Sequence, residues 1–170
     1  MIGSHDWLAN QLKASAEAFV WATRQIPPER LYATPPTLLG EWSAARHLLH
    51  MADYERDVAL PSIRQWFGGP YPLFEGYRRD AGYESVKSIE GLLAELQAAR
   101  AEQVTLLVGA GADTWQDVKK TAWGDRTLYW VVSKTYQHGV EHTNNVLKIA
   151  LLWEHYERRS QAGSREVIAD

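Results

Sequence analysis

The feature that most restricts how this chain can fold is a long helical repeat near its C-terminal end. Residues that can face a core recur there at alternating steps of three and four: Leu128, Val131, Thr135, His138, His142, Asn145, Ile149, Leu152 and Tyr156. This spacing is typical of the inward-facing seam of a helix in a bundle. We predict one helix, capped by Asp125 or Thr127 and ending near Arg158.

Three other segments show helical spacing of apolar residues. They run from about Asp6 to Gln25, from Ser43 to Phe67, and from Ser85 or Ser88 to Val108. The segments between them contain helix-breaking residues, in the stretches IPPERLYATPPTLLGEW, GGPYP and GAGAD. We find no convincing strand pattern, and four long helices without strands predict an all-α fold, a four-helix bundle. Pro61, inside the second segment, is expected to kink or shorten its last turns.

Composition limits the kind of protein that this chain can be. Its 170 residues, 45% hydrophobic and 23% charged, suit one soluble domain, which we place at residues 1–160 with a polar tail at 161–170. The net charge of −3 and the lack of a Lys/Arg-rich run argue against a nucleic-acid partner. No apolar run approaches the ~18 residues that cross a membrane, and no secretory signal opens the chain, so we expect a cytoplasmic protein.

Two further counts bear on function. The chain has no cysteine, so disulfides, thiolate ligands and a cysteine nucleophile are all excluded. It has eight tryptophans, which is many for its length. Their large rings either cover helix ends or line a cavity or a contact between subunits.

Two histidines in the long helix could bind a metal ion. His138 and His142 lie one turn apart and project from the same face, at a separation that suits a single ion. Burying two imidazoles is costly unless their nitrogens are satisfied. Spacing alone leaves two readings open, which are a metal site and a pair of hydrogen-bonded core histidines.

A further ligand could come from the second helical segment, which contains His47 and His50. His50 shares a polar stripe with four charged residues, Arg46, Asp53, Asp57 and Arg64. Such a stripe is usually a face in contact with solvent, although it can also line a wet internal cleft. Composition does not decide between the two.

These motifs together resemble the DinB superfamily (DinB/YfiT-like). The first signature is Trp42-Ser43, then His50 eight residues after the tryptophan, then Met51-Ala52-Asp53; the second is the late His-x-x-x-His of His138 and His142. The resemblance covers most of the chain. It implies an up-down-down-up bundle, a frequent homodimer, and a divalent metal ion, most often zinc or nickel, held by His50, His138 and His142.

The chain departs from the family pattern after its last histidine motif. Many members carry a further histidine and Gly-Gln there, where this chain has Thr143-Asn144-Asn145. The ligands remain in place, but the neighbouring pocket wall and hence the substrate are left open. His47 is an extra histidine that we interpret as a bystander or a group supporting a ligand, whereas His5 and His155 are expected at the surface.

Three imidazole ligands leave a metal position open, as in catalytic rather than structural sites. We expect nearby carboxylates to orient the rings or to act as a base, and Glu141 and Asp53 are the candidates, with Tyr54 behind them. Glu141 could equally face solvent as an ordinary surface charge.

Three functions remain for a small-molecule substrate. The first is a metal-dependent thiol S-transferase, because relatives join low-molecular-weight thiols to electrophiles and the metal would activate a thiol that this cysteine-free chain cannot supply. The second is a metal-dependent hydrolase with metal-bound hydroxide as the nucleophile. The third is a non-enzymatic metal-binding, stress-associated protein. Basic residues that could bind the carboxylates of a thiol cosubstrate are Arg46, Arg64, Arg78 and Arg79.

Overall fold

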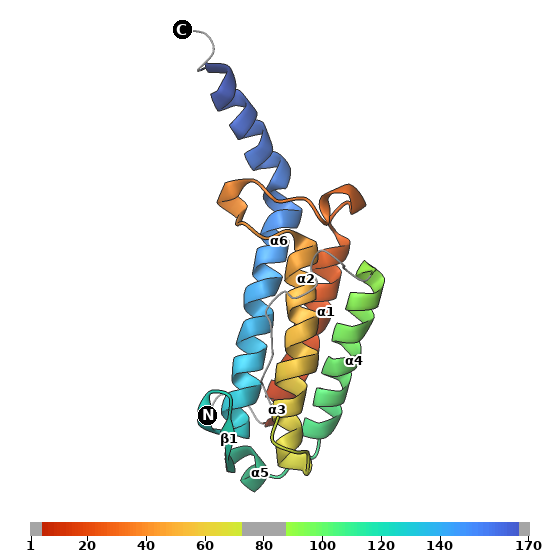
Figure 1. The fold of residues 1–170 in the computed structure, drawn as a ribbon, viewed down its shortest axis with the longest axis vertical. Coiled ribbons are helices and arrows are strands. Elements are labelled where there is room, and N and C mark those ends of the chain that lie inside the picture. Colours follow the sequence, from red (N-terminus) through yellow and green to blue (C-terminus); the bar gives the residue numbers. More distant parts are fainter. Residues whose placement is uncertain (1–4, 73–87, 167–170) are drawn as a thin grey trace.

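The computed structural model describes residues 5–72 and 88–166, with side chains up to residue 159. Its elements follow one another as α1 (His5–Arg24), η1 (Pro28–Arg30), η2 (Thr37–Leu39), α2 (Ala44–Tyr54), η3 (Glu55–Ala59), α3 (Leu60–Arg64), η4 (Gln65–Phe67), α4 (Ile89–Leu107), α5 (Ala112–Gln116), β1 (Val118–Thr121), β2 (Gly124–Thr127) and α6 (Leu128–Glu166). Figure 1 shows α1, the rod from α2 to η4, α4 and α6 side by side along one axis.

The directions of these rods give the predicted topology. Ion pairs join Arg56 to Glu95 and Arg64 to Glu102, so the α2–η4 rod and α4 run parallel to each other. In Figure 1 the chain ascends in α1, descends in both of those rods and ascends again in α6. The order is therefore up-down-down-up, and the prediction of a mostly helical four-helix bundle is confirmed.

The second helical segment forms one continuous rod from α2 to η4. Ser43 caps it, since its side chain accepts a hydrogen bond from the Arg46 N–H at 3.2 Å. The rod passes through Pro61 without ending there, because the preceding segment η3 widens into a π-helical turn. Proline removes one backbone donor and crowds the preceding turn, and a wider turn relieves both effects. The rod ends at Gly68, whose φ is 85°.

A short antiparallel hairpin corrects the expectation that the chain has no strand. β1 and β2 pair from Val118–Thr127 to Thr121–Gly124, and the hairpin turns at Ala122 and Trp123. The hydroxyl of Thr121 holds this turn by donating to the Gly124 carbonyl at 2.7 Å and accepting from the Trp123 N–H at 3.1 Å. Each strand has four mostly polar residues, which is too short for a period of two to stand out in the sequence.

The long helix α6 begins as predicted and ends later than predicted. Thr127 caps it by accepting from the Trp130 N–H at 3.2 Å, whereas Asp125 lies in β2. The helix continues past Arg158 to Glu166, so most of the expected tail at 161–170 is helical, and residues 167–170 lie outside the described part. Its last turns project beyond the bundle (Figure 1). Near this end the buried seam shifts by one position, so Trp153 is buried while Leu152 is 39% exposed.

The interior is divided into an apolar layer at each end and a polar layer between them. One apolar cluster contains Phe19, Leu48, Leu96 and Ile149, and the other contains Leu12, Ile63, Leu107 and Leu128. The residues that separate the clusters on each helix are Ser15, Glu55, Arg100, Gln103 and the histidines. All of the chemistry-bearing buried groups named below lie in this middle layer.

Gly139 allows the helices to approach closely in the middle layer. A Cβ atom at this position would lie 3.4 Å from the Ser15 hydroxyl and 3.5 Å from Arg100 Nη2. The α6 backbone thereby comes near both α1 and α4. Among the described helices, none combines the length and apolar character that crossing a bilayer requires.

Candidate metal centre

Four imidazole rings meet in the middle layer between α2 and α6. Nε2 of His50 lies 3.1 Å from Nε2 of His138, and Nδ1 of His47 lies 2.9 Å from Nδ1 of His142. His47, His50 and His142 are buried, and His138 is half-buried. The sequence left open whether the polar stripe of this helix faces solvent or an internal cleft. At His50 it lines an internal cleft.

Helical spacing on each side produces this arrangement. His138 and His142 are one turn apart on α6, with ring centroids separated by 4.6 Å, and the ring of His50 lies 4.8 Å from that of His142. Trp42, just before the capping serine of α2, packs against the cluster with its ring 5.3 Å from those of both His47 and His50. Trp42 thus forms an aromatic wall beside the imidazoles.

The three predicted ligands fit a divalent metal ion. One ring nitrogen from each of His50, His138 and His142 can be chosen so that all lie within 4.8 Å of one another. Ligand nitrogens ~2.0–2.1 Å from a tetrahedral zinc ion lie roughly 3.4 Å apart. The His50–His138 pair is already close to this value, and rotation of side chains by under about 1.5 Å at the nitrogen would bring in the third ligand.

The electrostatics of the site also suit metal binding. Burial is the largest influence on His142, and the neighbouring rings of His138, His47 and His50 act in the same direction, lowering its pKa to about 2. His142 is therefore neutral at physiological pH, which is the form of imidazole that binds a metal.

His47 supports His142. The contact between their Nδ1 atoms occupies one nitrogen of His142 and leaves Nε2 as the nitrogen available to an ion. Partners of this kind fix the tautomer and orientation of a ligand ring. Of the two interpretations of His47, bystander or supporting group, the structure favours the supporting group.

The histidines open onto a cavity of ≈ 510 Å³. Its lining comes from α2, η3, α6 and the turn of the hairpin: Trp42, His50, Tyr54, Val58, Ala122, Trp123, Lys134, His138, Glu141 and His142. A volume of this size is within the range of small-molecule sites, ~300–1,000 Å³. The hairpin that the sequence analysis missed thus supplies part of the cavity wall.

The two carboxylate candidates have different surroundings. Glu141 is exposed and lies on the rim of the cavity, next to His142 in the chain. Asp53 faces the other way: Arg56 Nη2 lies 2.7 Å from its Oδ1, beside the ion pair between Arg56 and Glu95. Burial is the largest influence on Asp53 and raises its pKa, against the opposing effect of Arg56. The structure therefore brings Glu141 to the histidines, and pairs Asp53 with Arg56.

Neither Arg46 nor Arg64, the two described basic residues proposed from the sequence, lines the cavity. The guanidinium of Arg46 lies over the Trp42 ring at 4.5 Å, and Arg64 pairs with Glu102 on the surface of α4. Arg78 and Arg79 lie outside the described residues. Among the described residues, the cation that lines the cavity is Lys134, which the sequence analysis did not single out. The sequence feature that could have predicted Lys134 as a cavity residue is its position four residues before His138, because residues at that spacing share a helix face.

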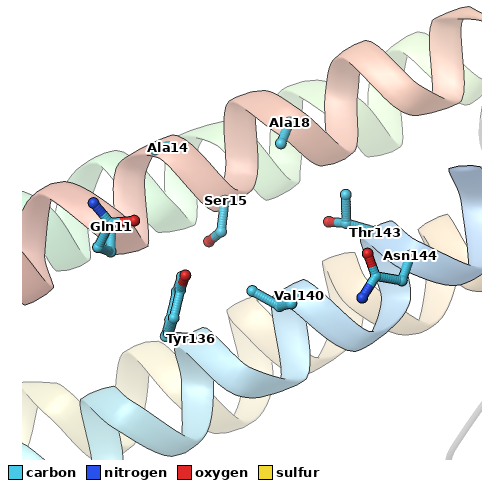
Figure 2. Close-up of a pocket in the computed structure, with 8 residues that line it drawn as sticks. All are labelled: Gln11, Ala14, Ser15, Ala18, Tyr136, Val140, Thr143 and Asn144. Atoms are coloured by element: carbon cyan, nitrogen blue, oxygen red, sulfur yellow. The ribbon is translucent and has the colours of Figure 1, made fainter.

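Thr143 and Asn144, two of the residues at which this chain departs from the family pattern, line a second, separate hollow. Figure 2 shows Thr143, Asn144, Val140 and Tyr136 of α6 across from Ser15 and its neighbours on α1. This hollow of ≈ 230 Å³ contains no carboxylate, imidazole or ammonium group in its lining. Thr143 and Asn144 thus line a space on another side of α6, and the wall beside the histidines is built by other residues.

Of the two remaining histidines, one lies at the surface as expected and the other does not. His155 is exposed, as expected, while His5 is half-buried and its ring stacks on that of the buried Trp115 at 4.7 Å. Trp42 and Trp123 line the cavity, so the large number of tryptophans contributes to the site. Trp66, Trp115 and Trp153 are core residues.

Comparisons with known proteins agree with the fold and with the resemblance to the DinB superfamily. The model of the DinB superfamily matches residues 11–146, and the chain belongs to this superfamily. Its fold is similar to that of YfiT from Bacillus subtilis, described as a probable metal-dependent hydrolase with an unusual four-helix bundle topology. The TM-score is 0.71 at 17% identity, over 95% of this chain and 91% of YfiT. Among curated proteins, none matches this chain by sequence.

Proposed function

We propose that this protein holds one divalent metal ion, zinc or nickel, through His50, His138 and His142, and that it is a metal-dependent thiol S-transferase. The observation that carries the proposal is the set of three imidazole donors within 4.8 Å of one another, opening onto a cavity of ≈ 510 Å³. A bound ion would lower the pKa of a thiol or a water molecule that it coordinates.

The residues around the site have separate tasks in this proposal. His47 contacts Nδ1 of His142 and leaves its Nε2 available to the ion, and Trp42 packs against the rings. Val58, Ala122 and Trp123 form an apolar wall that excludes water from the bound reactants. Glu141, on the rim, is the group placed to accept the proton of the nucleophile.

The transferase proposal rests on two properties of the chain. It has no cysteine of its own, so a sulfur nucleophile must come from a small-molecule thiol. The cavity is large enough to hold a small thiol and an electrophile together. In the reaction the thiol gives up its proton, its sulfur forms a bond to the electrophilic carbon, and the leaving group departs with the bonding electron pair.

A metal-dependent hydrolase is the second candidate, and the exposure of Glu141 favours it. An accessible carboxylate beside the histidines can remove a proton from water as well as from a thiol. YfiT is itself described as a probable metal-dependent hydrolase.

One experiment separates these functions. The purified protein is assayed for metal content, and then for conjugation of a panel of small thiols to a chromogenic electrophile, with and without a chelator. The transferase proposal requires thiol-dependent turnover that the chelator abolishes and zinc or nickel restores. Turnover that ignores the chelator, or none with any thiol, contradicts it.

The same preparation tests the alternatives. Ester or amide cleavage that depends on metal and not on thiol identifies a hydrolase. Stoichiometric metal without either activity identifies the third reading, a non-enzymatic metal-binding protein. Light scattering on the same sample tests the expected homodimer.

A further inference from the structure

We propose that the ligand of this cavity carries an anionic group, such as a carboxylate, which Lys134 binds while the reacting group lies at the histidines. The inference rests on the proposed metal site and specifies its substrate class. That class is a small acid in which an apolar segment separates the anion from the reacting atom.

The position of Lys134 carries the first step of this inference. It lies on α6 one turn before His138, half-buried, and it lines the same cavity as the three candidate ligands. With a helical rise of 1.5 Å per residue, its Cα is about 6 Å from that of His138 along the axis. A flexible lysine stem can therefore bring its ammonium group over a ligand that reaches the imidazoles.

The charge of Lys134 is available to a ligand. Lys134 makes no ion pair with any residue in the described part of the chain, whereas the nearby Arg56, Arg64 and Arg100 all pair with carboxylates. A half-buried ammonium beside aromatic walls gains more from an anion than a fully solvated one does, because the cavity screens charge less than water. Lys134 is thus a cation of the cavity without a protein partner among the described residues.

The walls of the cavity determine the chemistry of the ligand segment between its anionic group and its reacting group. Ala122 and Trp123 from the hairpin turn face this space together with Val58 of η3. The Trp123 ring is held by the Trp130 ring, whose centroid is 5.7 Å away. A flat or aliphatic segment would bury its apolar surface against these side chains on the path from Lys134 to the histidines.

Glu141 determines which way round the ligand binds. It lies seven residues after Lys134, two turns further along the same face of α6 and next to His142 in the chain. An anionic group near Glu141 would be repelled, whereas the same group near Lys134 is attracted. The acid end of the ligand therefore points towards the hairpin.

The test uses probes that bind a metal ion regardless of which nucleophile the protein activates. Succinic acid monohydroxamate and its uncharged counterpart, in which the carboxylate is replaced by a carboxamide, are titrated into zinc-loaded protein by calorimetry. We expect the acid to bind about tenfold more tightly than the amide. In K134M this preference disappears, while K134R retains most of it.

Lys148 supplies the matched control, because it is an exposed lysine of α6 outside the cavity. K148M should bind both probes as the unmodified protein does. Equal affinity for acid and amide in the unmodified protein overturns the inference, as does a preference that survives in K134M.

Failure of the proposed function gives a different result. If the protein retains neither zinc nor nickel, neither probe binds at the histidines and both proposals fall. If zinc is retained at one ion per chain but the carboxylate has no effect, only the inference about Lys134 falls.

Discussion

The middle layer of the bundle contains two buried polar clusters, which differ in whether groups of opposite charge meet within the cluster. In the first cluster, Glu55 lies between Arg100 Nη2 and Gln103 Nε2, and Arg100 Nη1 donates to the Leu12 carbonyl at 3.1 Å and to the Ser15 hydroxyl. Donors there meet acceptors within the protein. The second cluster is the set of four histidines, in which like groups face like groups and the cavity lies alongside.

This difference separates a structural cluster from a functional one. Burial raises the pKa of Glu55, but Arg100 and Gln103 counteract that effect, so the charge of the carboxylate is balanced within the protein. The histidine rings have no opposite charge among themselves, and His138, His47 and His50 each lower the pKa of His142. A cation from outside satisfies such a group of donors, whereas nothing from outside is needed by the ion pair.

The largest expected effect comes from breaking the first cluster. Glu55→Gln leaves the Arg100 guanidinium buried without its countercharge, the two side chains being 0% and 3% exposed. We expect a loss of about 3–5 kcal/mol in the free energy of unfolding, measured by urea denaturation. The metal content of the fraction that folds should not change.

The surface pair of Arg64 and Glu102, which are 47% and 43% exposed, is the control. Arg64→Ala should cost less than about 1 kcal/mol. A similar loss in the free energy of unfolding for both variants would show that the buried cluster stabilises the fold no more than the surface pair does.

The second effect comes from removing a ligand of the other cluster. His138→Ala, His142→Ala and His50→Ala should each reduce bound zinc or nickel from one ion per chain to near zero, because two imidazoles hold these ions weakly. Metal analysis after dialysis measures this, and the exposed His155 provides the control variant His155→Ala. Retention of the metal by His50→Ala would move the third ligand to His47.

A smaller effect is expected for the residue that supports a ligand. His47→Ala removes the contact to Nδ1 of His142, and we expect the affinity for the metal to fall about 10–100-fold while its stoichiometry stays at one. His47→Gln, which keeps a side-chain hydrogen-bonding group, should recover part of the loss. Competition with a coloured chelator gives the affinities, and an unchanged value for His47→Ala would return His47 to a bystander.

The smallest effect is a pH dependence of stability in the metal-free protein. His142 has its pKa lowered to about 2 in the fold against about 6.5 when unfolded, so below pH 6.5 only the unfolded chain takes up this proton. Stability should therefore fall as the pH drops, by about 1.4 kcal/mol per pH unit from this residue. In His142→Gln the slope between pH 6 and pH 5 should be shallower by about that amount, and identical slopes would contradict the buried neutral ring.

Much of the fold follows from local pattern. The serine and threonine caps at Ser43, Ser88 and Thr127 were predictable, because a short hydroxyl side chain before an apolar repeat satisfies the first free N–H groups of a helix. The hairpin was not predictable, since its strands are short and polar and their pairing is stabilised by contacts with the bundle.

The candidate site was only partly predictable for the same reason. The spacing of His138 and His142 placed them on one helix face, and the family resemblance added His50. No pattern within α2 shows that His47 meets His142 at 2.9 Å, or that Asp53 turns towards Arg56. Those contacts depend on how one helix is rotated about its axis relative to another. The spacing of residues within a single helix does not reveal that rotation.

The amino-acid sequence by itself determined the four long helices and the family, because apolar periodicity, caps and breakers act within one segment. Only the tertiary structure decided which polar residues share a space. In the folded protein, Glu55 pairs with Arg100. Lys134, Glu141 and Trp123 of the hairpin line the cavity. The physical reason is that burial and electrostatic partners arise between segments far apart in the chain, when the helices pack.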